Sequence, residues 1–205
     1  MTAGKEALLI YWRTTSTITD DKILKVFEKV PRENFILQKY ASDAYFDEPL
    51  PIGYGQTISQ PTTVAIMTSA LNPKTGQKIL EIGTGSGYQA AILSELAGEA
   101  GKVYTLERIK ELASFARKNL KDYKNVSAIH ADGTKGYKKA APYDCIIVTA
   151  AASELPKQLF VQLKENGVMV IPIEDHLFRI TKVKGKSVME DLGLFAFVPL
   201  VTGKL

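Results

Sequence analysis

The sequence predicts an α/β fold, a doubly wound and mostly parallel sheet with helices on both faces, and two observations support this prediction. From residue 78 onward, short apolar runs of strand length alternate with longer segments of helical periodicity. A glycine-rich turn, GTGSG, directly follows the first of these runs. Strands that alternate with helices form right-handed crossovers and pair in parallel, so we expect ligands to bind at the carboxyl edge of this sheet.

The first part of the chain is predicted to be a helical extension of the sheet. Helices are predicted over 3–13 and 20–30, and Pro31 ends the second one. The segment 43–61 is rich in proline and glycine and is predicted to be a long ordered loop, which usually serves function inside a compact domain. A further helix, over 61–71, begins with a proline that suits the first helical turn.

The alternating region is followed by a region of strands alone. The predicted strands of the alternating region cover 78–83, 102–108, 126–132, 143–150 and 168–173, and its predicted helices cover 88–98, 109–123 and 155–167. Two further strands, over 176–185 and 187–201, have no helix between them, so they are predicted to form an antiparallel C-terminal edge. We see no repeat or linker, and the predicted organisation is a single domain with an N-terminal helical extension.

Composition and charge narrow the class of protein and its partners. Hydrophobic residues make up 45% and charged residues 23% of the 205 residues, as in an ordinary globular domain. The net charge of +4 comes from lysines scattered along the sequence, so no nucleic-acid partner is expected. The single cysteine, Cys145, allows no disulfide within the chain. Neither histidine has a second histidine or a cysteine pair at the spacing of a metal-binding motif, so no metal is predicted.

The predicted location is the cytoplasm, and no membrane partner is expected. No segment approaches the roughly 20 apolar residues that span a bilayer. The apolar patch near the N-terminus is too short for a secretory signal and has no small-residue cleavage site behind it.

The glycine-rich turn is a candidate cofactor-binding loop. Gly83, Gly85 and Gly87 lie between a predicted strand and the helix after it, where glycines let a cofactor approach the backbone closely. Tyr88 occupies the position at which the dinucleotide fingerprint G-x-G-x-x-G has its third glycine. This departure argues against a nicotinamide dinucleotide.

An acidic residue ends each of three successive predicted strands. Glu81 precedes the glycine turn, where its carboxylate can act on a positively charged group of a ligand. Glu107 is placed to accept hydrogen bonds from both hydroxyls of a ribose. Asp132, followed by Gly133, is placed to bind an adenine amino group. Taken singly, Glu81 or Asp132 can also be a surface charge or a helix cap, but together the three acids favour a cationic nucleoside over a pyrophosphate.

This combination resembles the class I methyltransferases that bind S-adenosylmethionine. The resemblance implies a Rossmann-like methyltransferase fold, in which the glycine turn carries the methionine end of the cofactor. The acid after the second strand then holds the ribose, and the aspartate after the third strand contacts adenine. S-adenosyl-L-methionine is the implied cofactor and S-adenosyl-L-homocysteine its product. The cofactor-binding residues implied in this way are Glu81, Gly83, Gly85, Gly87, Glu107, Arg108, Asp132 and Gly133.

Longer motifs resemble one family within this class, the protein-L-isoaspartate O-methyltransferases. They are PLPIGYGQTISQP, LEIGTGSGYQAAIL, ERIKEL, DGTKGY, APYDCIIVTAAASELP and the terminal FVPLV, and the similarity runs from about Val30 to Val201. It implies methyl transfer to the free α-carboxylate of L-isoaspartyl residues in damaged proteins and peptides. The domain then divides into N-terminal helices and a substrate loop over 1–60, a cofactor-binding core over 61–173 and antiparallel strands over 174–205. The first 18 residues match no motif of this family.

The same resemblance assigns the uncharged stretch GYGQTISQPTTVAIM, residues 53–67, to the substrate. It implies that Ser59 is the catalytic residue. A neutral hydroxyl can hydrogen-bond a substrate carboxylate, whereas an acid would repel it and a lysine could pair too strongly with the ground state. From the sequence alone, Ser59 is equally well a helix N-cap or a turn residue before Pro61. The implied substrate-binding residues are Ile52, Gly53, Tyr54, Gly55, Thr57 and Val201.

Two other functions are weighed against this one. The first is an S-adenosylmethionine-dependent methyltransferase that acts on RNA or a small metabolite, which only the isoelectric point near 9.0 favours. The second is an RNA-binding module on a relict cofactor fold, which requires a basic and aromatic stripe that the sequence lacks.

Overall fold

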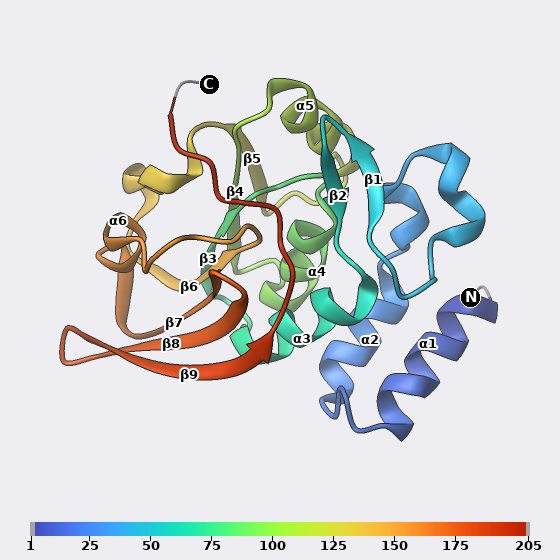
Figure 1. Ribbon diagram of the computed structural model, residues 1–205, viewed down its shortest axis with the longest axis horizontal. Coiled ribbons are helices and arrows are strands. Elements are labelled where there is room, and N and C mark those ends of the chain that lie inside the picture. The colour runs from blue at the N-terminus through green and yellow to red at the C-terminus, as the bar shows by residue number, and fades with distance from the viewer. Residues whose placement is uncertain (1–2, 204–205) are drawn as a thin grey trace.

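The computed structural model of the protein describes residues 3–203, and its centre is a seven-stranded sheet with the order β5-β4-β3-β6-β7-β8-β9 (Figure 1). The strands are β3 (Lys78–Ile82), β4 (Lys102–Glu107), β5 (Val126–His130), β6 (Tyr143–Val148), β7 (Leu163–Ile173), β8 (His176–Val183) and β9 (Lys186–Leu194). The strands from β5 to β7 pair in parallel, whereas β7, β8 and β9 pair antiparallel. The predicted doubly wound, mostly parallel sheet with an antiparallel C-terminal edge is confirmed.

The two faces of the sheet are covered unequally. Side chains alternate along each strand, so Ile79 packs into a core shared with the large helices, whereas Leu80 and Ile82 face the opposite side. Three of the helices that share the first core with the sheet are α3 (Pro61–Leu71), α4 (Tyr88–Ala97) and α5 (Lys110–Asn119). The second core receives the short helix α6 (Lys157–Phe160). Helices thus cover both faces, as predicted, but the second face has much less helix.

The N-terminal extension consists of α1 (Ala3–Thr14) and α2 (Asp21–Lys29), which confirms both predicted helices. Asp20 caps α2, because its side chain accepts a hydrogen bond from the backbone N–H of Lys22 at 2.8 Å. The apolar side of α2 packs against α3 and α4, so the extension joins the first core of the sheet.

The predicted loop 43–61 is more structured than its composition indicates. It contains an antiparallel hairpin of β1 (Leu50–Gly53) and β2 (Gln56–Ile58). Gly53, Tyr54 and Gly55 all have positive φ and form the tip of this hairpin. Apolar side chains at both strands are buried, and this burial stabilises a hairpin that proline and glycine content alone does not predict.

The predicted helix over 155–167 is wrong over most of its length, because only Lys157–Phe160 is an α-helix and β7 begins at Leu163. Asn166 adopts a left-handed φ of 60°, which a continuing helix does not allow. Residues of β7 pair with β6 on one side and β8 on the other. Tertiary pairing therefore overrides a local helical pattern.

The last predicted strand, 187–201, ends early, because β9 stops at Leu194 and the chain then turns back over the sheet. The N–H of Ala151 donates to the carbonyl of Val198 at 2.8 Å, and the N–H of Leu200 donates to the carbonyl of Ala151 at 2.7 Å. Residues 195–201, in red in Figure 1, form a return segment that crosses the sheet at the carboxyl end of β6.

Candidate active site

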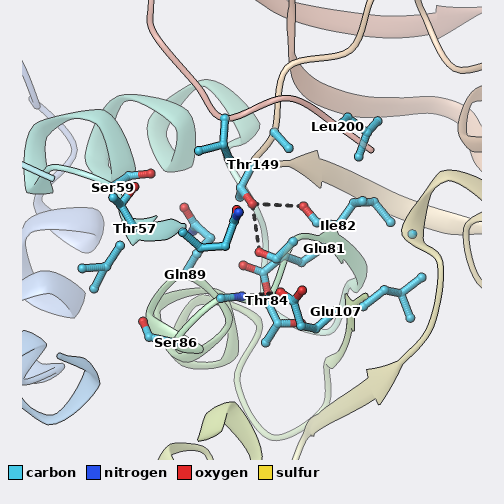
Figure 2. A pocket seen from close by; sticks show the side chains of 18 of the residues that line it. Thr57, Ser59, Glu81, Ile82, Thr84, Ser86, Gln89, Glu107, Thr149 and Leu200 are labelled. Atoms are coloured by element: carbon cyan, nitrogen blue, oxygen red, sulfur yellow. Dashed lines mark hydrogen bonds between the residues drawn. The ribbon is translucent and has the colours of Figure 1, made fainter. Parts of the chain in front are cut away.

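A cavity lies at the carboxyl ends of β3, β4 and β6. The strand order reverses at β3, with β4 on one side and β6 on the other, and α/β sheets bind ligands at such switch points. The cavity holds about 1000 Å³ of empty space, including its open mouth. Its walls come from β2, α3, the glycine turn, the strand ends and the return segment (Figure 2).

The glycine turn is held in place by a threonine from the neighbouring strand end. The hydroxyl of Thr149 donates to the carbonyl of Gly83 at 2.8 Å, with the carbonyl of Ile82 at 3.1 Å. Gly83 has a φ of 93°, and a β-carbon there would lie 2.4 Å from the Thr149 hydroxyl. Only glycine therefore fits at this position, and the backbone of the turn is exposed to the cavity that it lines.

Glu107, at the end of β4, is fixed by two backbone donors. The N–H of Gly85 donates to Oε2 and the N–H of Ile109 donates to Oε1, both at 2.9 Å. The side chain is buried and lines the cavity. Because a carboxylate oxygen has more than one acceptor site, each oxygen can accept a further hydrogen bond from a ligand. The backbone thus presents a preoriented negative acceptor at this wall.

Glu81, at the end of β3, is a fully buried acid whose carboxylate oxygens have no hydrogen-bond partner among the described residues. It lines the cavity next to the glycine turn. Burial raises the pKa of Glu81 to about 8; the nearby Thr105 hydroxyl opposes this rise and the negative charge of Glu107 adds to it. Ligand-free Glu81 therefore stays largely protonated near neutral pH, and a positively charged ligand group would stabilise its ionised form.

Several polar side chains in the cavity were not singled out from the sequence, among them Thr84, Ser86, Gln89 and Thr149 (Figure 2). The Nε2 of Gln89 donates to the hydroxyl of Thr68 at 3.0 Å. Thr84 and Ser86 belong to the GTGSG turn, and Thr149 lies near the end of the predicted strand 143–150 and directly after β6, so the strand-end rule that selected the acids applies to them too. Gln89 lies inside a helix and carries no such local signal.

Ser59 lies between β2 and α3 and lines the cavity with Thr57, on the side away from Glu107 (Figure 2). The N-cap residue of α3 is Gln60, which makes no side-chain cap hydrogen bond. The alternative in which Ser59 is the N-cap of this helix is therefore wrong. No described residue hydrogen-bonds the Ser59 hydroxyl, which is thus available to a ligand.

The predicted site residues divide by their position. The cavity is lined by Thr57, Ser59, Glu81, Gly83, Gly85, Glu107, Arg108, Gly133 and Val201. Ile52, Gly53, Tyr54, Gly55, Gly87 and Asp132 lie outside its lining. The carboxylate of Asp132 instead accepts from the N–H and the hydroxyl of Thr134, at 3.0 and 2.7 Å, and so caps a short 3-10 turn.

The residues outside the lining have other surroundings. Ile52 is buried and its Cδ1 would lie 3.3 Å from a β-carbon at Gly85, so it supports the glycine turn from behind. Tyr54 is exposed at the tip of the hairpin. Gly87 is the N-cap residue of α4. Within residues 3–203, no group of histidine, cysteine and acidic residues could hold a metal ion, and no helix is long and apolar enough to cross a bilayer.

Solved structures with this fold define the class of the protein. One, described as a protein-L-isoaspartate O-methyltransferase from Plasmodium falciparum in complex with S-adenosyl-L-homocysteine, matches with a TM-score of 0.86 and 30% identity, covering 98% of this chain and 99% of that chain. Another, described as a protein-L-isoaspartate O-methyltransferase, has a TM-score of 0.88 and 30% identity, covering 98% of this chain and 67% of that chain. The fold and the cavity at its switch point are those of an S-adenosylmethionine-dependent methyltransferase.

Sequence relatives narrow this class. The protein-L-isoaspartate O-methyltransferase of Dictyoglomus thermophilum is 53% identical over 189 residues, which cover 89% of this chain and 84% of the relative. That of Staphylothermus marinus is 47% identical over 210 residues, which cover 96% and 93%. The profile of the family described as Protein-L-isoaspartate(D-aspartate) O-methyltransferase (PCMT) matches residues 3–205, and the chain belongs to this family.

Proposed function

We propose that this chain methylates the free α-carboxylate of L-isoaspartyl residues in damaged proteins and peptides, with S-adenosylmethionine as the methyl donor. Membership of the family supports this function. The observation that carries the proposal is that one cavity joins two chemically different walls. Buried acids at the strand ends, Glu81 and Glu107, form one wall, and the uncharged Thr57 and Ser59 form part of the other.

The strand-end wall fits S-adenosylmethionine, which when bound supplies a methyl group on a positively charged sulfur. We assign Glu81 to a cationic group at the methionine end, because a ligand cation would give this buried acid a positively charged partner, which no neighbouring side chain among the described residues supplies. We assign Glu107 to the ribose hydroxyls, because its two backbone bonds already fix its orientation. Gly83 and Gly85 let the ligand lie against the backbone of the turn.

Four further residues complete the proposed cofactor site: Gly87, Arg108, Asp132 and Gly133. A β-carbon at Gly133 would lie 2.5 Å from Cγ2 of Ile82, so this part of the wall requires glycine. Asp132 keeps acceptor capacity beyond its bonds to Thr134, which supports its proposed contact with the adenine amino group.

The residues of the substrate wall have to align the substrate carboxylate and do not have to remove a proton from it. The isoaspartyl carboxylate is already an anion, so no residue of the chain has to remove a proton from it. Alignment of two bound reactants can supply roughly 7 to 11 kcal/mol of barrier reduction. We assign this alignment to the hydroxyl of Ser59, with that of Thr57 beside it. A peptide would then reach the cavity along Ile52, Gly53, Tyr54 and Gly55, with Val201 on the opposite rim.

Methyl transfer to matched peptides tests the proposed function. Two peptides that differ only in an aspartyl or an isoaspartyl linkage are incubated with the protein and S-adenosylmethionine that carries a labelled methyl group. We expect base-labile label in the isoaspartyl peptide alone. Equal labelling of both peptides, or labelling of RNA in their place, would contradict the proposal.

Three broader predictions accompany this function. We propose that the chain acts in the cytoplasm, that it has no nucleic-acid or membrane partner, and that residues 1–205 form one methyltransferase domain. A salt titration of binding to nonspecific RNA checks the second point, because a steep loss of affinity with salt would indicate several phosphate contacts.

A further inference from the structure

The helix α1 reaches the segment that carries Ser59. Trp12, near the end of α1, is 1% exposed, and its indole N–H donates to the hydroxyl of Thr62 at 2.7 Å. Thr62 lies in the first turn of α3, three residues after Ser59. A side chain far away in the sequence is therefore bonded to the start of the helix that follows the proposed catalytic residue.

Thr62 is held from a second direction by Asp47. The backbone N–H of Thr62 donates to Oδ1 of Asp47 at 2.8 Å. This bond replaces a local cap, since Gln60 makes no side-chain cap hydrogen bond and Pro61 has no N–H. The start of α3 is thus fixed by two distant segments rather than by its own sequence.

Trp12 is itself fixed by aromatic packing, and the same group of rings includes Tyr88, which follows the glycine turn. Its ring meets Phe27 edge-on, with the ring centres 5.2 Å apart, and Phe27 meets Tyr88 at 6.2 Å. Tyr88 lines the cavity directly after the glycine turn. Trp12 therefore connects the start of α3 with the start of α4, and both helices contribute residues to the cavity wall.

The chain before Thr62 has few other polar restraints. The β1–β2 hairpin has only two strands, and such a hairpin is marginally stable on its own. Thr57 is exposed, Ser59 is half-buried, and no described residue hydrogen-bonds the Ser59 hydroxyl. A displacement of about 1 Å in an aligning group can lower a rate by roughly 100-fold, so the position of this segment matters for the reaction.

We infer that Trp12 and Asp47 form a clamp on Thr62, called the Thr62 clamp, and that this clamp positions Ser59 for methyl transfer. The inference rests on the proposed role of Ser59. Trp12, Asp47 and Thr62 are positioning residues, because none of them lines the cavity and each acts through the start of α3. The helix α1, to which the sequence motifs assign no role, thereby contributes to the alignment of Ser59.

Two substitutions of the same residue test the clamp. Thr62→Val keeps the shape of the side chain but removes the acceptor for Trp12, and Thr62→Ser keeps the hydroxyl. We expect Thr62→Val to lower kcat for an isoaspartyl peptide about 5- to 30-fold, with KM nearly unchanged, and Thr62→Ser to stay within about 2-fold of the wild type. The affinity for S-adenosyl-L-homocysteine, measured by calorimetry, should not change in either variant.

Two controls accompany this pair. Trp12→Phe keeps an aromatic ring against Phe27 but removes the N–H donor, so it should reproduce the loss of kcat in Thr62→Val. Thr15→Val is the matched control, because Thr15 is an exposed threonine whose hydroxyl bonds only to the end of α1 and to Thr17. Thr62→Val with wild-type kcat but a lower melting temperature would show a merely structural contact and would overturn the inference.

Combination with Ser59→Ala separates the clamp from the proposed function. If the clamp acts through Ser59, Thr62→Val should cause no further loss of kcat in the Ser59→Ala background. A lower kcat in Ser59→Ala together with a wild-type kcat in Thr62→Val would overturn the clamp and leave the proposed function standing. A wild-type rate in Ser59→Ala would overturn the proposed role of Ser59 and, with it, the clamp. An independent, additive loss in the double variant would also contradict the inference.

Discussion

The two walls of the cavity differ in burial and in charge. At the strand ends, Glu81 and Glu107 are almost inaccessible to solvent, and backbone donors fix the second of them. On the other side, Thr57 is exposed, Ser59 is half-buried and Val201 is 44% exposed, without any charge among them. A small charged cofactor can be enclosed by fixed buried acids, whereas a residue of a large damaged protein needs an open and neutral rim.

Ser59→Ala should have the largest effect and should separate the walls most clearly. A lost hydrogen bond at an aligning position costs on the order of 2 to 4 kcal/mol, so the methyl-transfer rate at saturating peptide should fall roughly 30- to 1000-fold. Affinity for S-adenosylmethionine should stay near that of the wild type, because the strand-end wall is untouched. Single-turnover kinetics and calorimetry measure the two quantities.

The matched control for Ser59→Ala is Ser42→Ala, at an exposed serine whose hydroxyl bonds only to Asp43. It should have no effect on the rate. A Ser59→Ala variant with a wild-type rate would remove the aligning role from the substrate wall. Thr57→Val in the same background measures how much of that role the neighbouring hydroxyl can take over.

Glu107→Ala should have the next largest effect, on the opposite wall. Loss of the charged acceptor should weaken S-adenosylmethionine binding by about 1 to 3 kcal/mol. The N–H groups of Gly85 and Ile109 would also lose their partner, so disorder of the glycine turn would add to the loss of the proposed ribose contact. Calorimetry measures the change, with exposed Glu99→Ala as the control. Unchanged affinity in a folded variant would place the ribose elsewhere.

Glu81→Gln should change how stability depends on pH. An unfolded glutamate titrates near pH 4.3, whereas the pKa of Glu81 in the folded, ligand-free protein is about 8. Between these values the folded protein holds a proton that the unfolded chain has released, so the contribution of Glu81 to stability decreases as pH rises and levels off above about 8.

The neutral amide cannot lose that proton, so Glu81→Gln should lose less stability than the wild type between pH 5 and 8. Each kcal/mol of difference corresponds to about 2 to 4 °C in melting temperature for a domain of this size. The same variant should bind S-adenosylmethionine more weakly, because the carboxylate that we propose faces the ligand cation is gone. Parallel pH profiles of melting temperature for variant and wild type would refute the buried-acid interpretation.

Asp132→Ala should have the smallest effect and tests the edge of the strand-end wall. Loss of a cap costs about 1 kcal/mol of stability. Asp20→Ala is the matched control, because Asp20 caps α2 through a comparable bond of 2.8 Å and does not line the cavity. Both variants should melt earlier, but only Asp132→Ala should also bind S-adenosyl-L-homocysteine more weakly. Equal affinities in both would restrict Asp132 to its role as a cap.

The sheet was predictable from the sequence because its central strands are continuous apolar runs bounded by turns. The segment 155–167 was not, because Leu159 and Leu163 have helical spacing and both are buried, yet the first lies in α6 and the second begins β7. Burial alone does not distinguish a helix from a strand over so short a distance. Pairing with β6 and β8 makes the difference, and this information is not local.

The site shows the same limit. Gly83, Glu81 and Glu107 could be selected because their residue types and their places at strand ends carry a chemical meaning on their own. The bond from Trp12 to Thr62 joins residues 50 positions apart, and nothing in either segment indicates the other. Contacts that position a functional group from a distance become visible only when the chain is folded.

The return segment also has a consequence for the order in which the protein is made. Residues 198–201 form part of the cavity wall, but they follow all seven strands of the sheet in the chain. During translation, the strands and the glycine turn leave the ribosome before the residues that bridge to Ala151. The complete cavity wall is therefore among the last features to form, and a chain still in synthesis has the sheet before it has a complete site.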